Sequence, residues 1–122
     1  MSRETTPINP RVLCRLEDLD DCASRGFSLP GESPGQGLEL FLVRQGNAVY
    51  AYRNRCPHTG APLEWQPHQF LDEQGELIQC ALHGALFAIA SGLCLRGPCA
   101  GKSLEALPLL VTEEGLVVLY PK

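Results

Sequence analysis

Short runs of apolar, β-prone residues separated by polar turns recur along most of the chain. The two clearest are Leu38–Arg44 and Ala48–Arg53, which flank the tripeptide Gln45-Gly46-Asn47. Gly46 and Asn47 both tolerate the positive φ that a tight turn requires. The pattern therefore predicts an antiparallel hairpin over these residues.

Other runs of the same kind predict further strands on both sides of this hairpin. They are Arg11–Leu16, Glu76–Cys80, Ala85–Ala90, Leu107–Thr112 and Leu116–Tyr120. Glu17–Asp21 is acidic and short, so we expect a turn or a single helical turn there. The stretch from Gly26 to Gly37 is rich in Gly, Pro and Ser, which is typical of a loop.

No segment has the periodicity of a helix of three turns, and the sequence contains no internal repeat. The 12 glycines and 10 prolines are scattered along the chain, which suits short strands joined by tight turns. The sequence therefore predicts an all-β fold, a small antiparallel sandwich or barrel.

The length of the chain suits one domain. Of its 122 residues, 44% are hydrophobic and 20% are charged, so it can bury a real core. Residues 1–10 are polar, contain Pro7 and Pro10 and show no periodicity. We expect them to form a flexible N-terminal arm, with residues 11–122 as a single domain.

Charge and hydropathy exclude several classes of partner. The net charge is −4 and no basic block is present, which argues against nucleic acid as a partner. No apolar run approaches the roughly eighteen residues of a membrane-spanning helix. The first residues lack the features of a secretion signal, so we expect a cytoplasmic protein. In that compartment the 6 cysteines favour metal binding over a disulfide framework.

Two short segments combine a thiol with an imidazole. They are Cys56-Pro57-His58 and Cys80-Ala81-Leu82-His83, and each follows a predicted strand. Either segment alone could hold a small buried cysteine and an ordinary polar histidine. Two such pairs, which take up two of the 3 histidines, favour a metal site with two sulfur and two nitrogen ligands.

The order of the ligands bears on which metal they would hold. Zinc accepts two cysteines and two histidines, and a structural zinc site could form here. Zinc fingers, however, usually pair like ligands, whereas each segment here is mixed. Mixed pairs suit a two-iron cluster with unlike ends, in which cysteines bind one iron and histidines the other.

Both segments resemble the cluster-binding loops of Rieske [2Fe–2S] proteins. The resemblance lies in CPHTGAPL (56–63) and CALHGALF (80–87), and Arg96-Gly97-Pro98 matches the proline-containing loop of that family. Twenty-one residues separate His58 from Cys80, more than the family usually has. We therefore expect an insertion over Trp65–Gly75, whose role the sequence leaves open.

The resemblance implies one [2Fe–2S] cluster held by this chain. Cys56 and Cys80 would ligate one iron, and His58 and His83 the other. It also implies a small antiparallel β-domain with two cluster-binding hairpin loops.

Neighbouring positions place the chain in one branch of that family. Ala61 and Leu82 stand where the respiratory members carry two further cysteines, so the disulfide of that branch cannot form. Ala85 and Phe87 stand where the same members carry hydroxyl groups that raise the potential. We therefore expect the low-potential, ferredoxin-like branch.

The function that this resemblance implies is one-electron transfer rather than catalysis. A flavin reductase would supply the electron, and an oxygenase or similar redox enzyme would accept it. If the cluster takes two histidines, only His68 remains, which cannot build the 2-His-1-carboxylate iron site of an oxygenase. Two alternatives stay open: an accessory small subunit of a nitrite-reductase-like enzyme, and a structural zinc-binding interaction module.

Four cysteines lie outside the two segments: Cys14, Cys22, Cys94 and Cys99. We expect Cys14 and Cys94 to be core or strand residues. Cys99 follows the proline-containing loop, where packing is favoured over a Cys94–Cys99 disulfide. The sequence assigns no role to Cys22.

Three other side chains each have an ordinary and a functional interpretation. His68 is expected to be a solvated loop residue. Trp65 is expected to cover apolar surface beside the first loop, with docking of a partner as the alternative. Arg55, next to Cys56, either steers an acidic partner or is a solvated charge, and the sequence does not separate these.

Overall fold

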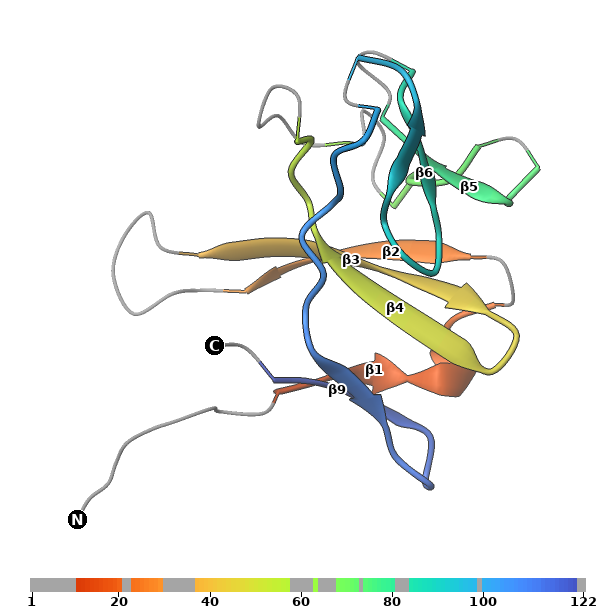
Figure 1. The fold of residues 1–122 in the computed structure, drawn as a ribbon. Helices are drawn as coiled ribbons and strands as arrows, with labels where there is room; N and C mark the ends of the chain where they lie inside the picture. Colours follow the sequence, from red (N-terminus) through yellow and green to blue (C-terminus); the bar gives the residue numbers. More distant parts are fainter. Residues whose placement is uncertain are drawn as a thin grey trace.

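The computed structural model describes residues 11–20, 23–29, 37–57, 63, 68–72, 74–80, 84–98 and 100–120 (Figure 1). Within these ranges the chain forms nine strands and one short 3₁₀ helix. In chain order they are β1 (Arg11–Arg15), η1 (Leu16–Asp18), β2 (Ser24–Leu29), β3 (Leu38–Gln45), β4 (Ala48–Arg53), β5 (Leu77–Gln79), β6 (Leu86–Ala88), β7 (Cys94–Arg96), β8 (Leu109–Val111) and β9 (Leu116–Leu119).

The strands form three antiparallel sheets of three strands each, with the orders β1-β9-β8, β2-β3-β4 and β5-β6-β7. In Figure 1 the sheet β2-β3-β4 lies between the other two, with β1-β9-β8 below it and β5-β6-β7 above. The prediction of an all-β fold is confirmed.

Strand β3 is the centre of the middle sheet and is buried on both of its faces. Leu40, Phe41, Leu42 and Val43 are each at most 1% exposed. Because successive side chains of a strand point to opposite faces, these residues serve two cores at once. This explains why the run is continuously apolar instead of alternating.

The lower core lies between the middle sheet and β1-β9-β8. Its buried members are Leu19, Leu40, Leu42, Ala51, Val117 and Leu119. The upper core lies between the middle sheet and β5-β6-β7. Its buried members are Phe41, Val43, Tyr52, Cys56, Leu63, Phe70, Ile78, Cys80, Ala85, Phe87, Ile89, Cys94 and Leu104. Both cysteines of the predicted metal site therefore belong to the upper core.

The predicted hairpin is confirmed, with a two-residue turn. Gln45 pairs with Ala48, so Gly46 and Asn47 alone connect β3 to β4. Gly46 has a φ of +64°, a conformation that glycine adopts without steric cost. The single helical turn expected after the first strand is also present, as η1.

The prediction of a loop from Gly26 to Gly37 is wrong in its first part. Residues 24–29 form β2, which pairs with β3 from Ser24–Val43 to Leu29–Leu38. Phe27 and Leu29 pack against the lower core from this edge strand. Strand β7 was not predicted either; Cys94 pairs with Phe87 of β6 there. Residues 30–36 lie outside the described residues.

The predicted N-terminal arm, residues 1–10, also lies outside the described residues. Among the residues that the structure does describe, no helix is long and apolar enough to cross a membrane.

Candidate metal centre

Cys56 follows the end of β4 at the start of the first predicted ligand loop. The backbone turns there because the Arg55 N–H donates to the Arg53 carbonyl at 2.8 Å. Farther along, the Leu63 N–H donates to Oδ1 of Asn54 at 2.8 Å. This bond holds the two ends of the loop together. Cys56 itself is 1% exposed, so its sulfur points into the upper core.

Cys80 follows β5 at the start of the second predicted ligand loop. Its N–H donates to the Ala85 carbonyl at 2.9 Å, and its carbonyl accepts from the Gly84 N–H at 2.8 Å. Gly84 has a φ of +68°, which turns the chain back toward β6. These bonds make a tight loop between β5 and β6, and they leave Cys80 fully buried.

The two cysteines start neighbouring loops and share one apolar cluster. Cys56 takes part in no disulfide. Metal and cluster sites bind cysteine as the thiolate, so that the metal takes the place of the thiol proton. Two such thiols are therefore suited to a metal or a cluster that accepts thiolates, and the donor set that the structure describes fits an iron–sulfur group.

His58 and His83 lie outside the described residues. Within the described part of the chain, no group of three or more His, Cys, Asp or Glu side chains comes together. Both predicted cysteine ligands thus lie in one apolar cluster, and the assignment of all four ligands stays a prediction.

The segment after β7 approaches the second loop closely. Gly97 has a φ of +107°, and a Cβ at this position would lie 2.8 Å from Cα of Ala85. Any side chain at residue 97 would therefore push the two segments apart. This contact places the predicted proline-containing loop directly against the segment that follows Cys80.

Cys94 lies in β7 and is buried, as predicted for a core or strand residue. Its Sγ donates to the Arg96 carbonyl at 3.1 Å, and its N–H donates to the Lys102 carbonyl at 2.8 Å. Cys14 lies half-buried in β1, where burial raises the pKa of its thiol. Cys22, Trp65 and Cys99 lie outside the described residues.

Ala85 and Phe87, which stand where the respiratory members of the family carry hydroxyl groups, lie inside the upper core. Ala85 and Phe87 are each fully buried in the cluster that holds Cys56 and Cys80. A hydroxyl there could donate to a sulfur, whereas a methyl group or a phenyl ring cannot. Their burial supports the predicted low potential, because fewer donors leave the charge of a reduced cluster less stabilised.

Tyr52 joins the middle sheet to the turn between β6 and β7, a role that the sequence did not reveal. Its hydroxyl donates to the Ile89 carbonyl at 2.6 Å. A Cβ at Gly92 would lie 2.7 Å from Cε1 of Tyr52, so the turn packs directly on the ring. Burial raises the pKa of Tyr52 to about 12, so the hydroxyl keeps its proton near neutral pH.

The insertion is represented in the described residues by 68–72 and 74–75. Phe70 is fully buried and stacks on Phe41 with ring centroids 4.3 Å apart. Its carbonyl accepts from the Gln79 N–H at 2.8 Å, beside Cys80. The insertion thus contributes a core side chain behind the candidate metal centre, which the sequence did not predict.

His68 is exposed, as predicted, and it also fastens the insertion to β2. Its Nδ1 accepts from the Gly26 N–H at 3.0 Å, and its carbonyl accepts from the Ser24 hydroxyl at 2.8 Å. Its φ of +67° is unusual for a residue with a side chain.

Comparison with known proteins identifies similar sequences. Residues 9–115 match the family described as Rieske [2Fe-2S] domain. Pheophorbide a oxygenase of Arabidopsis thaliana is 32% identical over 106 residues, which are 87% of this chain and 18% of that protein. Ferredoxin CarAc of Metapseudomonas resinovorans is 29% identical over 87 residues, which are 71% of this chain and 72% of that protein.

A solved structure shares the whole fold. The ferredoxin of carbazole 1,9a-dioxygenase from Nocardioides aromaticivorans IC177 superimposes with a TM-score of 0.69 at 26% identity. The match covers 93% of this chain and 98% of that ferredoxin. The three-sheet architecture described above is therefore that of a known electron-transfer protein.

Proposed function

Since this chain belongs to the Rieske [2Fe-2S] domain family, we propose that it is a ferredoxin that carries single electrons between larger redox proteins. The cofactor of that family is one [2Fe–2S] cluster, so the zinc-binding alternative is not retained. When bound, such a cluster accepts and releases one electron.

One observation carries this proposal. The chain spans 72% and 98% of two ferredoxins but only 18% of the oxygenase that it also resembles. It is therefore similar to carriers over most of their length and to an oxygenase over one part. The similarity to these two ferredoxins supports electron transfer as the activity of this chain and does not support oxygen activation.

We assign Cys56 and Cys80 to one iron and His58 and His83 to the other. The burial of both cysteines supports the first assignment, because thiolates in an apolar pocket need a metal to balance their charge. Leu63, Ala85 and Phe87 belong to the same apolar cluster as the two cysteines and are fully buried, which supports a site from which water is excluded.

The partners in this proposal are a flavin reductase as donor and an oxygenase or similar redox enzyme as acceptor. The similarity to a ferredoxin of carbazole 1,9a-dioxygenase supports an oxygenase as the acceptor. We also propose that residues 11–122 form one Rieske domain after an N-terminal arm of residues 1–10. A cytoplasmic location is part of the proposal, and the thiol of Cys14, which forms no disulfide, is compatible with it.

Cluster analysis of the purified chain tests the proposal. Protein made with ample iron should be red-brown and hold two irons and two acid-labile sulfides per chain. After reduction it should give a paramagnetic resonance signal with an average g value below that of the free electron. Colourless protein, or protein that holds zinc in place of iron, would contradict the proposal.

Variants of three cysteines test the ligand assignment. Cys56→Ala and Cys80→Ala should lose the iron, because each removes a thiolate. Cys14→Ala is the matched control and should keep it, since Cys14 lies in β1, outside the upper core. A variant of Cys80 that retains the spectrum of the native cluster would remove that residue from the ligand set.

A further inference from the structure

The two sequence stretches that contain the predicted ligand loops differ in sign of charge from the whole chain. The net charge is −4, yet residues 77–104 contain Arg96 and Lys102 and no carboxylate. Residues 53–63 contain Arg53 and Arg55 and no carboxylate. The two predicted ligand loops therefore lie in stretches that carry only positive charges.

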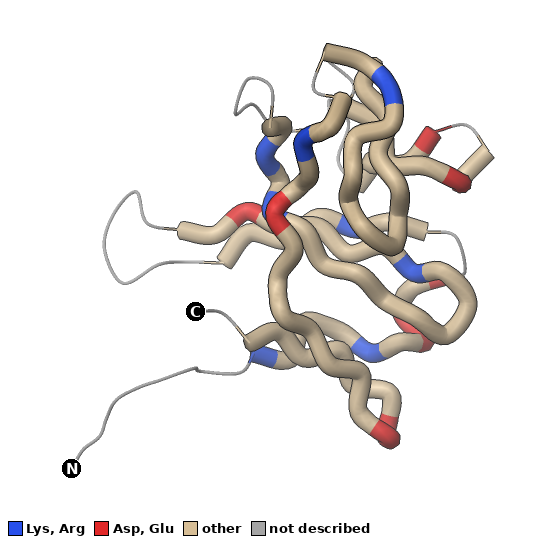
Figure 2. Tube along the Cα trace, in the orientation of Figure 1, with Lys and Arg blue, Asp and Glu red and all other residues tan. Residues whose placement is uncertain are grey.

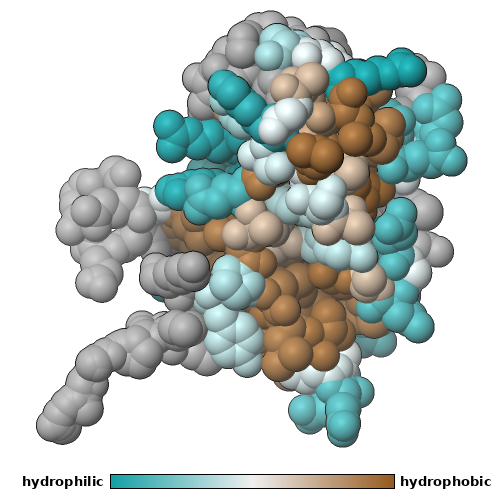
Figure 3. Space-filling model, in the orientation of Figure 1, coloured by the Kyte–Doolittle hydropathy of each residue, from teal (hydrophilic) through white to brown (hydrophobic). Residues whose placement is uncertain are grey.

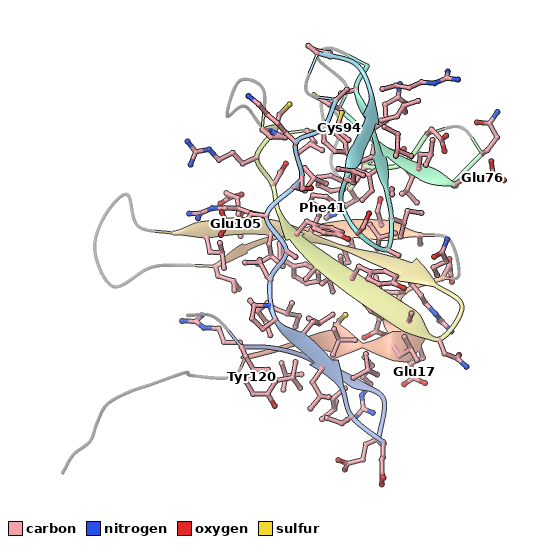
Figure 4. All side chains as sticks on the ribbon, in the orientation of Figure 1. Glu17, Phe41, Glu76, Cys94, Glu105 and Tyr120 are labelled. Carbon is pink, nitrogen blue, oxygen red and sulfur yellow. The ribbon has the colours of Figure 1, made fainter. Side chains whose placement is uncertain are left out.

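The carboxylates nearest to these stretches in the described sequence do not cancel this charge. Glu105 lies 3.6 Å from the Arg53 guanidinium and forms an ion pair with it. Glu76 projects from the start of β5 on the far side of the upper sheet, away from Cys94 (Figure 4). Among the described residues, the ion pairs include neither Arg55 nor Arg96 nor Lys102. All three of these cationic residues are exposed.

Backbone hydrogen bonds hold the three cations at one end of the molecule. The Arg53 N–H donates to the Glu105 carbonyl at 2.9 Å, which ties the end of β4 to the segment after Lys102. The Cys94 N–H donates to the Lys102 carbonyl at 2.8 Å, which ties that segment to β7. Figure 2 shows blue segments along the upper end of the tube; red segments lie just below them at the left, at the upper right and at the lower tip.

Exposed apolar side chains lie beside these charges. Leu93 and Leu95 are 40% and 50% exposed, and both point outward from the edge strand β7 and its start. Figure 3 shows a brown patch over β6 and β7, bordered by teal. Pro98 follows on the same segment and is also exposed. Apolar area beside the candidate centre, edged by charge, is the usual composition of a docking surface.

We propose that Arg55, Arg96 and Lys102 form a cationic rim around an apolar patch of Leu93 and Leu95, and that this surface docks a redox protein whose cofactor edge is surrounded by carboxylates. The inference rests on the proposed electron-carrier function and specifies the chemistry of its partner. It interprets Arg55 as a residue that steers an acidic partner, and not merely as a solvated charge.

The charges close to the docking surface determine whether a partner is attracted or repelled, because salt screens charges that lie farther away. The Debye length is about 10 Å at 0.1 M salt. A chain of this length is about 35 Å across. The acidic turn at Glu113 and Glu114, next to β9, therefore contributes little at the opposite end. An acidic partner is attracted to this end even though both proteins carry net negative charge.

Two haem proteins of opposite surface charge test the inference. The loaded, reduced protein is mixed with cytochrome b5, whose haem edge is surrounded by carboxylates, or with cytochrome c, whose haem edge is surrounded by lysines. The rate constant of electron transfer is measured as the ionic strength rises from low to physiological. With cytochrome b5 the rate should fall roughly tenfold, and with cytochrome c it should rise. If only the net charge of −4 mattered, the rate with cytochrome b5 would rise with ionic strength and the rate with cytochrome c would fall. That result would overturn the inference.

Charge-reversal variants assign the effect to the rim. Arg96→Glu/Lys102→Glu should reverse the salt dependence with cytochrome b5. The control Arg11→Glu/Arg25→Glu makes the same change in net charge on β1 and β2 and should leave it unchanged. Equal responses of the two double variants would overturn the inference. Arg96→Gln/Lys102→Gln should give an intermediate response, with iron content and spectrum confirming that the cluster is intact.

The dependence of the rate on ionic strength distinguishes the contribution of the apolar patch from that of the cationic rim. Leu95→Ser should slow transfer to cytochrome b5 about equally at low and high ionic strength, because it removes contact area and no charge. An unchanged rate in Leu95→Ser would exclude the patch from the surface. Protein that holds no reducible cluster would instead refute the electron-carrier function, and the inference would fall with it.

Discussion

At the scale of single residues, burial and spacing together distinguish the cysteines that the structure describes. Cys56, Cys80 and Cys94 all lie in the upper core, whereas Cys14 lies half-buried in β1. Only Cys56 and Cys80 start loops that contain a histidine two or three residues later. Among the cysteines that the structure describes, burial alone would have given three equivalent candidates, and spacing alone could not show that Cys56 and Cys80 lie in one apolar cluster.

The histidine assignment is tested most directly at residue 83. His83→Cys should keep a bound cluster and lower its reduction potential by on the order of 100 mV, because thiolate places more negative charge on the iron than imidazole does. Protein-film voltammetry measures this shift. An unchanged potential in an intact variant would show that His83 is not a ligand.

Tyr52 should be the polar side chain in the upper core on which stability depends most. Tyr52→Phe leaves the Ile89 carbonyl without its 2.6 Å partner and should lower the free energy of unfolding by about 1–3 kcal/mol. Urea unfolding of the loaded protein measures the loss. Tyr50→Phe, at a half-buried position of the same strand, is the control and should change it by less than about 0.5 kcal/mol.

The same residue predicts a loss of stability in alkali. Its pKa rises from 10.0 to about 12 on folding, so between these values the folded state holds a proton that the unfolded state has released. The stabilisation is complete below pH 10 and is lost as the pH rises toward 12. Tyrosinate absorbance should show a late-titrating group that Tyr52→Phe removes. The absence of a late-titrating group in the native chain would contradict the raised pKa of Tyr52.

At the scale of elements, strand β3 organises the molecule. Its alternating side chains supply Leu40 and Leu42 to the lower core and Phe41 and Val43 to the upper core. The two edge elements that sequence did not predict, β2 and β7, depend on pairing with strands that were already clear. Their own residues contain too few consecutive apolar positions to predict a strand.

The insertion should act as a structural support behind the metal centre. Phe70→Ala removes a fully buried ring stacked on Phe41 and should cost about 3–5 kcal/mol of stability. Phe27→Ala, at a partly buried position of β2, is the matched control and should cost less. Thermal unfolding of both variants measures the two losses of stability. Equal losses would show that the stacked position of Phe70 contributes no more to stability than the partly buried position of Phe27.

At the scale of the whole molecule, the two cores lie on opposite faces of one sheet, and both candidate cysteine ligands lie in the upper core. Removal of the cluster should therefore weaken the upper sheet first. Amide protons of β5, β6 and β7 should exchange roughly tenfold faster or more, and those of β1 and β9 should change little. Hydrogen exchange of the loaded and cluster-free protein measures this. A uniform loss of protection would show instead that the two cores open as one unit.

The amino-acid pattern was enough to predict the all-β class, the hairpin around Gly46 and the two segments that begin with Cys56 and Cys80. These features are local, because strand alternation, turn conformation and ligand spacing depend on residues close together in the chain. Three features became visible only in the folded molecule: residues 24–29 form a strand, Phe70 stacks on Phe41, and Gly97 packs against Ala85. Each of these depends on a partner that lies farther along the chain and comes near only when the sheets pack. A local pattern does not encode that contact, since the same residues would be a loop, an exposed ring or an ordinary glycine without it.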